Sequence, residues 1–272
     1  MKFSITGTPC KVSLDVPIVL RGDINYLLNK AHMYGYNGLE IHSNLASKID
    51  SDKILRAKKK YCLDISTLGT GLVYGIDGLS FSSEDRQIRL EAVNRIKDFI
   101  ILANKLNSKV IIGSVRGSLD DKYNDKCSAL IWIKECLSDC IEEAEKYNVI
   151  LLLEAINRYE TNFLNKVEDV FEFIRDFKTN ALAIHVDTFH MNIEETDICN
   201  SINWYIKNIK HIHFADSNRC YPGRGHINFR SIVDILKKNN YNEYIALECL
   251  SIPDEKTVSK EFINFTQNLN II

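Results

Sequence analysis

Short apolar runs rich in β-branched residues alternate along the whole chain with longer segments of helical period. Eight such runs cover residues 2–7, 38–43, 63–69, 109–115, 149–156, 182–187, 209–216 and 244–250. Strands separated by helical segments are typical of repeated βα units, which build a parallel sheet. Eight units in 272 residues predict an α/β fold, a (β/α)8 TIM barrel that forms a single domain over residues 1–272.

The segments between these runs carry signals for helices. Asp23 and Ser83 are suited to cap the helices that follow them, because a side-chain oxygen there accepts from the free amides of the first turn. Further helices are expected over residues 121–148, 167–178, 200–208, 228–240 and 254–270. The segment after the first run reads TGTPC and lacks a GxGxxG turn, which argues against an open dinucleotide-binding sheet.

Charge and composition argue against several classes of function. The chain has 34 Lys and Arg against 36 Asp and Glu, so it has no positive field that would attract nucleic acid or an anionic membrane. It contains no apolar stretch near the roughly 20 residues of a membrane span, and its N-terminus lacks the apolar core of a signal peptide. We therefore expect a cytoplasmic protein whose eight scattered cysteines are reduced thiols.

Four neighbouring runs end in side chains that could bind a metal ion. These residues are Glu154, Asp187, His213 and Glu248. In a TIM barrel the ligand and catalytic residues lie at the carboxyl ends of the strands, so we expect these side chains to meet. Crowded carboxylates need a cation or a shared proton to neutralise them. A donor set that is rich in oxygen suits Mn²⁺, Mg²⁺ or Co²⁺ better than a structural zinc ion.

Three segments around these residues resemble a known family. They read EAINRYETN (154–162), HVDTFHMNIEE (185–195) and HIHFADSNRCYPGRG (211–225). They are similar to the xylose-isomerase-like TIM barrels, and most similar to the D-tagatose/D-psicose 3-epimerase branch, which includes 5-keto-L-gluconate epimerase-like proteins. The resemblance implies a homo-oligomeric enzyme with one divalent ion, Mn²⁺ above all. It implies metal binding by Glu154, Asp187, His213 and Glu248, and substrate binding by Glu160, His190 and Arg219.

The same residues suit epimerisation of a ketose or keto-sugar acid at C3 through an ene-diolate. The proton leaves one face and returns on the other, so Glu154 and Glu248 could alternate as base and acid. The handedness of the substrate decides which of the two removes the proton. We also expect Arg116 to bind substrate, because a guanidinium can hold a carboxylate through two hydrogen bonds. If Arg116 and Arg21 both face the barrel mouth, the substrate is a keto-sugar acid; the alternative is that they form surface ion pairs.

Other functions remain open on the same barrel. An ene-diolate also serves aldose–ketose isomerases, and a dehydratase of the inosose or 3-dehydroshikimate type is a further alternative. An abasic-site nuclease of the endonuclease IV type would need further His and Asp ligands, which the GSVRG and DSNR segments do not supply. A barrel that only binds a sugar would not need the pair Glu154 and Glu248. His185 and His211 are expected to support the neighbouring metal ligands or to pack in the core.

Overall fold

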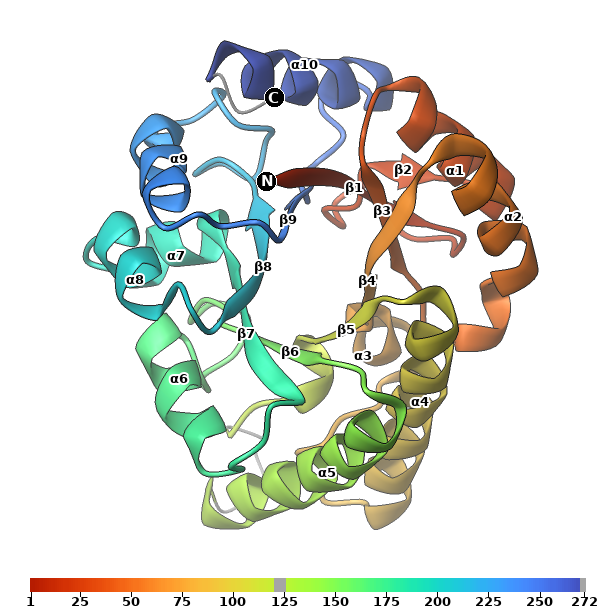
Figure 1. Cartoon of the computed structure of the whole chain (residues 1–272). Coiled ribbons are helices and arrows are strands. Elements are labelled where there is room, and N and C mark those ends of the chain that lie inside the picture. Colours follow the sequence, from red (N-terminus) through yellow and green to blue (C-terminus); the bar gives the residue numbers. More distant parts are fainter. Residues whose placement is uncertain (120–125, 270–272) are drawn as a thin grey trace.

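Eight parallel strands close into a barrel that is surrounded by helices (Figure 1). The computed structural model describes residues 1–119 and 126–269. The barrel strands follow one another in chain order, and the last strand pairs with the first. The predicted (β/α)8 TIM barrel is thereby confirmed.

The barrel strands are short and buried along most of their length. They are β1 (Lys2–Thr8), β3 (Gly38–His42), β4 (Asp64–Gly69), β5 (Lys109–Ile112), β6 (Leu151–Glu154), β7 (Leu182–Asp187), β8 (Ile209–Phe214) and β9 (Tyr244–Leu247). The two-residue strand β2 (Leu20–Arg21) adds to the end of β1. The predicted run 109–115 ends as a strand at Ile112, because the backbone at Gly113, with ψ −116°, leaves strand geometry.

Helices between the strands cover the outside of the barrel. They are α1 (Ile24–Met33), α2 (Ser51–Tyr61), α3 (Gly71–Asp77), α4 (Arg86–Leu106), α5 (Lys126–Tyr147), α6 (Val167–Arg175), α7 (Thr188–Glu194), α8 (Ile198–Tyr205), α9 (Phe229–Lys238) and α10 (Glu255–Asn268), with 3₁₀ turns η1 (Ala46–Lys48) and η2 (Ser114–Arg116). Parts of two predicted helices, 121–125 and 270, lie outside the described residues. Among the helices of residues 1–119 and 126–269, none combines the length and apolar character needed to cross a membrane.

Aspartates cap the helices that the sequence led us to expect after Asp23 and Ser83. Asp23 caps α1 as predicted, since its carboxylate accepts from the amide of Tyr26 at 2.9 Å. The prediction for Ser83 is wrong, because Asp85 is the N-cap of α4 and accepts from the amide of Gln87 at 2.8 Å. The ionised carboxylate is the stronger acceptor, and the Ser83 hydroxyl instead accepts from the amide of Asp85.

Two helices of seven residues, α3 and α7, were not predicted from the sequence. Each follows a strand directly, α3 after β4 and α7 after β7. Asp187 is at once the last residue of β7 and the N-cap of α7, where its carboxylate accepts from the amide of Phe189 at 2.8 Å. A helix of two turns shows too little periodicity to stand out in a sequence.

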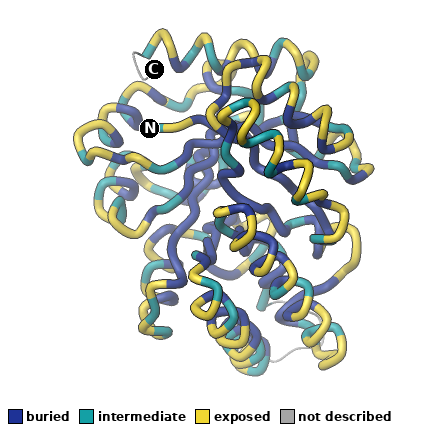
Figure 2. Tube along the Cα trace, turned by 45° about the vertical axis from the view of Figure 1, so that its right-hand side comes forward, coloured by how far each residue is buried: buried dark blue, intermediate teal, exposed yellow. Residues whose placement is uncertain are grey.

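The main apolar core lies between the barrel wall and the helices. In Figure 2 the strands form a buried centre, and the helices around it are exposed on their outer faces. The Phe262 ring of α10 packs edge-on against Phe3 and Phe214, with ring centroids 5.8 and 6.4 Å apart. These contacts fix α10 against the junction of β8, β9 and β1, where the barrel closes.

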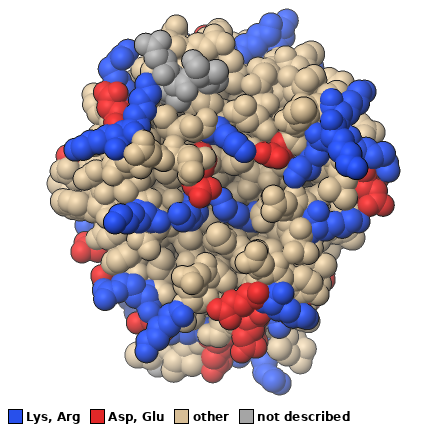
Figure 3. All heavy atoms as spheres, viewed as in Figure 1, with Lys and Arg blue, Asp and Glu red and all other residues tan. Residues whose placement is uncertain are grey.

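Charges at the surface and inside the barrel are arranged differently. On the face shown in Figure 3, Lys and Arg side chains are interspersed with Asp and Glu side chains. Inside the barrel, by contrast, the described residues include a buried cluster of four acidic side chains, Glu40, Glu154, Asp187 and Glu248. A buried charge must be paired or neutralised, so this interior cluster is where chemistry is expected.

Candidate active site

The ends of four adjacent strands bring the predicted metal ligands to one end of the barrel. Glu154 ends β6, Asp187 ends β7, His213 is the penultimate residue of β8, and Glu248 directly follows β9. The strand register pairs the Cα atoms of Asp187 and His213, and those of Glu154 and His185. The sheet itself therefore holds these residues side by side, independently of the loops.

The four side chains approach one another within a buried space. The Nδ1 atom of His213 lies 3.1 Å from Oε2 of Glu248 and 3.8 Å from Oδ2 of Asp187. Glu154, Asp187 and His213 each offer a ligand atom within 4.8 Å of the others. Glu154, His213 and Glu248 also line a cavity at this end of the barrel, whereas Asp187 is fully buried beside it. Three carboxylates and an imidazole form a donor set that fits a divalent cation.

The crowding changes the protonation of these carboxylates. Burial and the Glu248 carboxylate raise the pKa of Glu154 to about 8. Burial also raises the pKa of Asp187 to about 6, although Arg219 opposes this shift. Burial disfavours ionisation of Glu248 too, but His213 and Arg219 outweigh it and hold the pKa of Glu248 well below its usual range. The group carries more acid than its own cations neutralise, which is the property of a cation site.

Arg219 is the cation that already contacts this group. Its guanidinium donates to Oδ2 of Asp187 and to Oε2 of Glu248, the latter at 2.6 Å. It lies over the ring of Phe189, 4.7 Å from the centroid. The backbone of Arg219 has a φ of +62°, an uncommon conformation for a residue with a side chain. The loop after β8 is thus shaped to point this guanidinium into the cavity, where Arg219 forms part of the lining.

His190 and Glu160 reach the same cavity, and Asn157 connects them. The Asn157 amide nitrogen donates to Nδ1 of His190 at 2.6 Å and to Oε1 of Glu160 at 3.0 Å. Because Nδ1 accepts, the proton of a neutral His190 ring sits on Nε2, which lies 3.9 Å from Oε1 of Glu154. Burial and the charge of Arg219 lower the pKa of His190, so the ring is neutral. His190 therefore offers an N–H donor beside Glu154.

The model of the "Xylose isomerase-like TIM barrel" family matches residues 28–269. The chain belongs to this family. An L-ribulose 3-epimerase from Mesorhizobium japonicum is 31% identical over 209 residues, which cover 73% of this chain and 69% of that protein. A D-psicose 3-epimerase from Enterocloster bolteae is 26% identical over 83% of this chain and 76% of its own length. The resemblance read from the sequence motifs is confirmed, and these relatives are isomerase-class enzymes, as predicted for this chain.

Solved structures agree with the fold. A 3-keto-D-glucoside 4-epimerase from E. coli superimposes with a TM-score of 0.84 at 18% identity, and the match covers 98% of this chain and 99% of that one. Such a likeness at low identity shows the shared barrel over nearly the whole chain.

Neither Arg116 nor Arg21 forms part of the cavity lining. Arg116 is only 1% exposed, and its guanidinium donates to the carbonyl oxygen of Phe163 at 2.9 Å. The guanidinium of Arg21 donates to the Ser251 hydroxyl at 3.0 Å and to the carbonyl oxygen of Val16 at 2.8 Å. Arg116 does border a neighbouring depression that shares Glu160 with the cavity. Both guanidinium groups thus bind loop backbone and side-chain atoms in this structure. They do not both face the cavity, which was the arrangement expected for a site that binds a keto-sugar acid.

Apolar side chains and glycines form the rest of the cavity lining, beside the polar residues. The apolar side chains are Val16, Pro17, Ile18, Leu72, Ile111 and Ile156, and the glycines are Gly69, Gly71, Gly75 and Gly113. They come from the ends of β4 and β5, from α3 and from the loops after β1 and β6, whereas the polar group comes mainly from β6 to β9 and the loops that follow them. The polar side chains could bind hydroxyl and carbonyl groups, and the apolar side chains could contact the carbon chain of a ligand.

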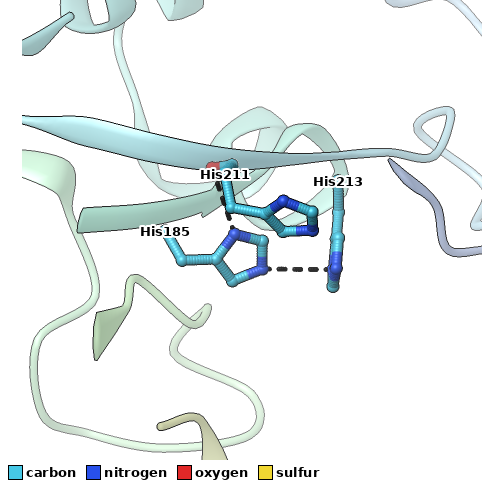
Figure 4. Close-up of side chains that lie close together, drawn as sticks. All are labelled: His185, His211 and His213. Carbon is cyan, nitrogen blue, oxygen red and sulfur yellow. Dashed lines mark hydrogen bonds between the residues drawn. The ribbon is translucent and has the colours of Figure 1, made fainter. Parts of the chain in front are cut away.

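Glu40 was missed in the sequence. It lies fully buried on β3, and its carboxylate contacts the imidazoles of His42, His211 and His213. Figure 4 shows two of these rings, from β8, together with His185 of β7, whose Nε2 lies 3.2 Å from Nδ1 of His213. The sequence does contain a sign of this residue, because an acidic side chain between Leu39 and Ile41 in an apolar run is unusual and points to a buried polar contact.

Proposed function

We propose that this protein is a divalent-metal-dependent epimerase that inverts C3 of a neutral ketose. The observation that carries this proposal is the pair Glu154 and Glu248, which line one cavity from β6 and from the end of β9. The strands that carry Asp187 and His213 lie between them. Inversion needs an acid and a base on two sides of one carbon, and this pair would serve as both.

Four residues would hold the ion, namely Glu154, Asp187, His213 and Glu248. Mn²⁺ is the proposed ion, with Co²⁺ or Mg²⁺ as alternatives for a donor set rich in oxygen. A bound divalent ion would supply charge that makes the C–H bond next to the ketose carbonyl more acidic. The excess of buried acid described above is what such an ion would neutralise.

The chain's own groups divide the proton transfers between them. With no cation bound, the pKa of Glu154 near 8 keeps that group protonated at neutral pH, while Glu248 is ionised. Two acids with separated pKa values are the usual basis of paired acid and base roles. The N–H of His190 and the guanidinium of Arg219 would donate to substrate oxygens, and Glu160 would accept from a hydroxyl.

The lining favours a neutral sugar over a keto-sugar acid. Among the residues that line the cavity, Arg219 is the single Lys or Arg, and it already contacts Asp187 and Glu248. A substrate carboxylate would find no further Lys or Arg side chain in that lining. The names of the relatives, L-ribulose and D-psicose 3-epimerase, agree with a neutral ketose.

Deuterium incorporation followed by NMR tests the proposal. Metal-stripped protein, with and without Mn²⁺, is incubated in D₂O with ribulose, psicose, fructose, tagatose and a keto-gluconate. We expect deuterium at C3 and a new C3 epimer of a neutral ketose, only with the ion present. Exchange at C1 or C2 with formation of an aldose would identify an isomerase, exchange at C4 a 4-epimerase, and loss of water a dehydratase. Turnover of the keto-gluconate alone would refute the neutral substrate.

We also propose that the protein works in a reducing compartment, the cytoplasm. Cys136 and Cys140, the two cysteines closest in sequence, are buried reduced thiols on α5. Burial raises the pKa of the Cys136 thiol to about 11, and that of Cys140 rises as well. Unreactive thiols of this kind suit packing positions and need no oxidising environment.

A further inference from the structure

We propose that Glu40 is a positioning residue for the metal site: its carboxylate fixes the ring orientation and the tautomer of His213. This inference rests on the metal binding proposed above. Glu40 lies on β3, across the barrel interior from His213 on β8.

Glu40 makes four close polar contacts and none of them reaches solvent. One carboxylate oxygen lies 2.8 Å from Nε2 of His213 and 2.7 Å from Nε2 of His42. The other lies 2.6 Å from Nε2 of His211 and accepts from the hydroxyl of Thr67. Such a carboxylate is held in one orientation, and it holds its partners in turn.

The contact with Glu40 decides which nitrogen of His213 carries the proton. An ionised carboxylate only accepts hydrogen bonds, so Nε2 of His213 must be the donor toward Glu40. The other nitrogen, Nδ1, faces Glu248 and Asp187 at 3.1 and 3.8 Å, and Nε2 of His185 at 3.2 Å. When the ring releases its Nδ1 proton to bind an ion, the remaining proton stays on Nε2 toward Glu40, and the lone pair is on Nδ1, on the side of the proposed ligands. A carboxylate in this role also makes the imidazole a stronger ligand.

Glu40 acts through other residues because it does not line the cavity, whereas His42, His213 and Glu248 do. His42 extends its influence to a second ligand, since Nε2 of His42 lies 2.7 Å from Glu40 and 3.9 Å from Oε1 of Glu248. His211 plays a different part, because its Nε2 contacts Glu40 and its Nδ1 has no hydrogen-bond partner among the described residues, so it does not continue from Glu40 to a proposed ligand. Glu40 thus contacts one proposed ligand, His213, directly and is connected to a second, Glu248, through His42.

Two substitutions test this role. Glu40→Gln removes the charge but keeps one acceptor, and Glu40→Leu removes both acceptors at similar volume. We expect Glu40→Gln to weaken Mn²⁺ binding by about tenfold and Glu40→Leu by about 100-fold, the range found when the partner of a ligating imidazole is lost. Binding is measured without substrate, by titrating metal-stripped protein and following the electron paramagnetic resonance of unbound Mn²⁺. The ring nitrogens of His213 in the Mg²⁺-loaded protein, observed by ¹⁵N NMR, report the tautomer directly.

Asp64→Asn is the matched control. Asp64 also lies on a barrel strand and accepts from the hydroxyl of Tyr244 at 2.8 Å, but it stands at the amino end of β4, away from the ligands. The Asp64→Asn variant should have a lower free energy of unfolding but an unchanged affinity for Mn²⁺. Unchanged affinity and an unchanged His213 tautomer in Glu40→Gln would overturn the inference, even if Glu40→Leu fails to fold. Wild-type protein that binds Mn²⁺ more tightly than the variants but epimerises no sugar would refute the proposed function and leave the role of Glu40 standing.

Discussion

Lowering the pH from 8 to 6 should weaken the binding of Mn²⁺ by about 50-fold. The reason is Glu154, whose pKa is raised to about 8 by burial and by Glu248 in the metal-free protein. Below pH 8 this carboxyl holds a proton that the ion must displace. Each pH unit below that pKa costs about a factor of ten, but the group is already half protonated at pH 8, so the Glu154 proton accounts for about 50-fold between pH 8 and pH 6. Above pH 8 the contribution of Glu154 should level off.

His213 adds to the effect in the same direction. Burial opposes its protonation, but Glu248 and Glu40 outweigh burial and raise the pKa of His213 well above its usual range. The ring must therefore also release a proton from Nδ1 when it binds an ion. The folding stability of the metal-free protein should depend on pH in the opposite direction. A carboxyl whose pKa is raised in the folded state stabilises the fold at low pH. That stability is lost as pH rises from about 4.5 through 8.

Calorimetric titration with Mn²⁺ at pH 6, 7 and 8, in buffers of different ionisation enthalpy, measures both the affinity and the protons released. Thermal melts of the metal-free protein over the same range measure the opposite trend. Glu154→Gln is the control, because an amide has no proton to release and the pH dependence should become shallower. An affinity that is flat between pH 6 and 8 in the wild-type protein would refute the reasoning, since it would mean that Glu154 is already ionised.

Three further predictions concern catalysis, the cavity wall and the core. Glu154→Gln and Glu248→Gln should each abolish epimerisation while circular dichroism stays unchanged; substantial turnover in either would exclude the two-acid scheme. Gly113→Ala should lower turnover by up to about 100-fold with little change in melting temperature, because the added Cβ would lie 2.7 Å from Oε2 of Glu154 and displace that flexible carboxylate. Phe262→Ala should cost about 3–5 kcal/mol in urea unfolding, since this fully buried ring packs on two barrel strands; a cost below 1 kcal/mol would contradict that packing.

The barrel, and the end of it that carries the candidate site, could be predicted from the sequence alone. The period of the apolar residues is a local property, so it identifies strands and helices without knowledge of their partners. Once the strands are parallel, their carboxyl ends must lie at one end of the sheet. Glu154, Asp187 and Glu248 could therefore be grouped although they are far apart in the chain. The cap at Ser83 was wrong because a neighbouring carboxylate, Asp85, competes for the same amides.

Contacts across the barrel depended on the tertiary structure. Glu40 meets His213 over a separation of 173 residues, and no local pattern says which interior side chains will touch. Arg116 and Arg21 follow strands as the ligands do, but packing turns their guanidinium groups onto backbone carbonyls instead of into the cavity. The sequence by itself determined the fold and the end of the barrel where the candidate site lies, since both follow from period and chain direction. Which polar groups meet there, and with what protonation, was decided by burial and distance, and these exist only after the strands have closed into a barrel.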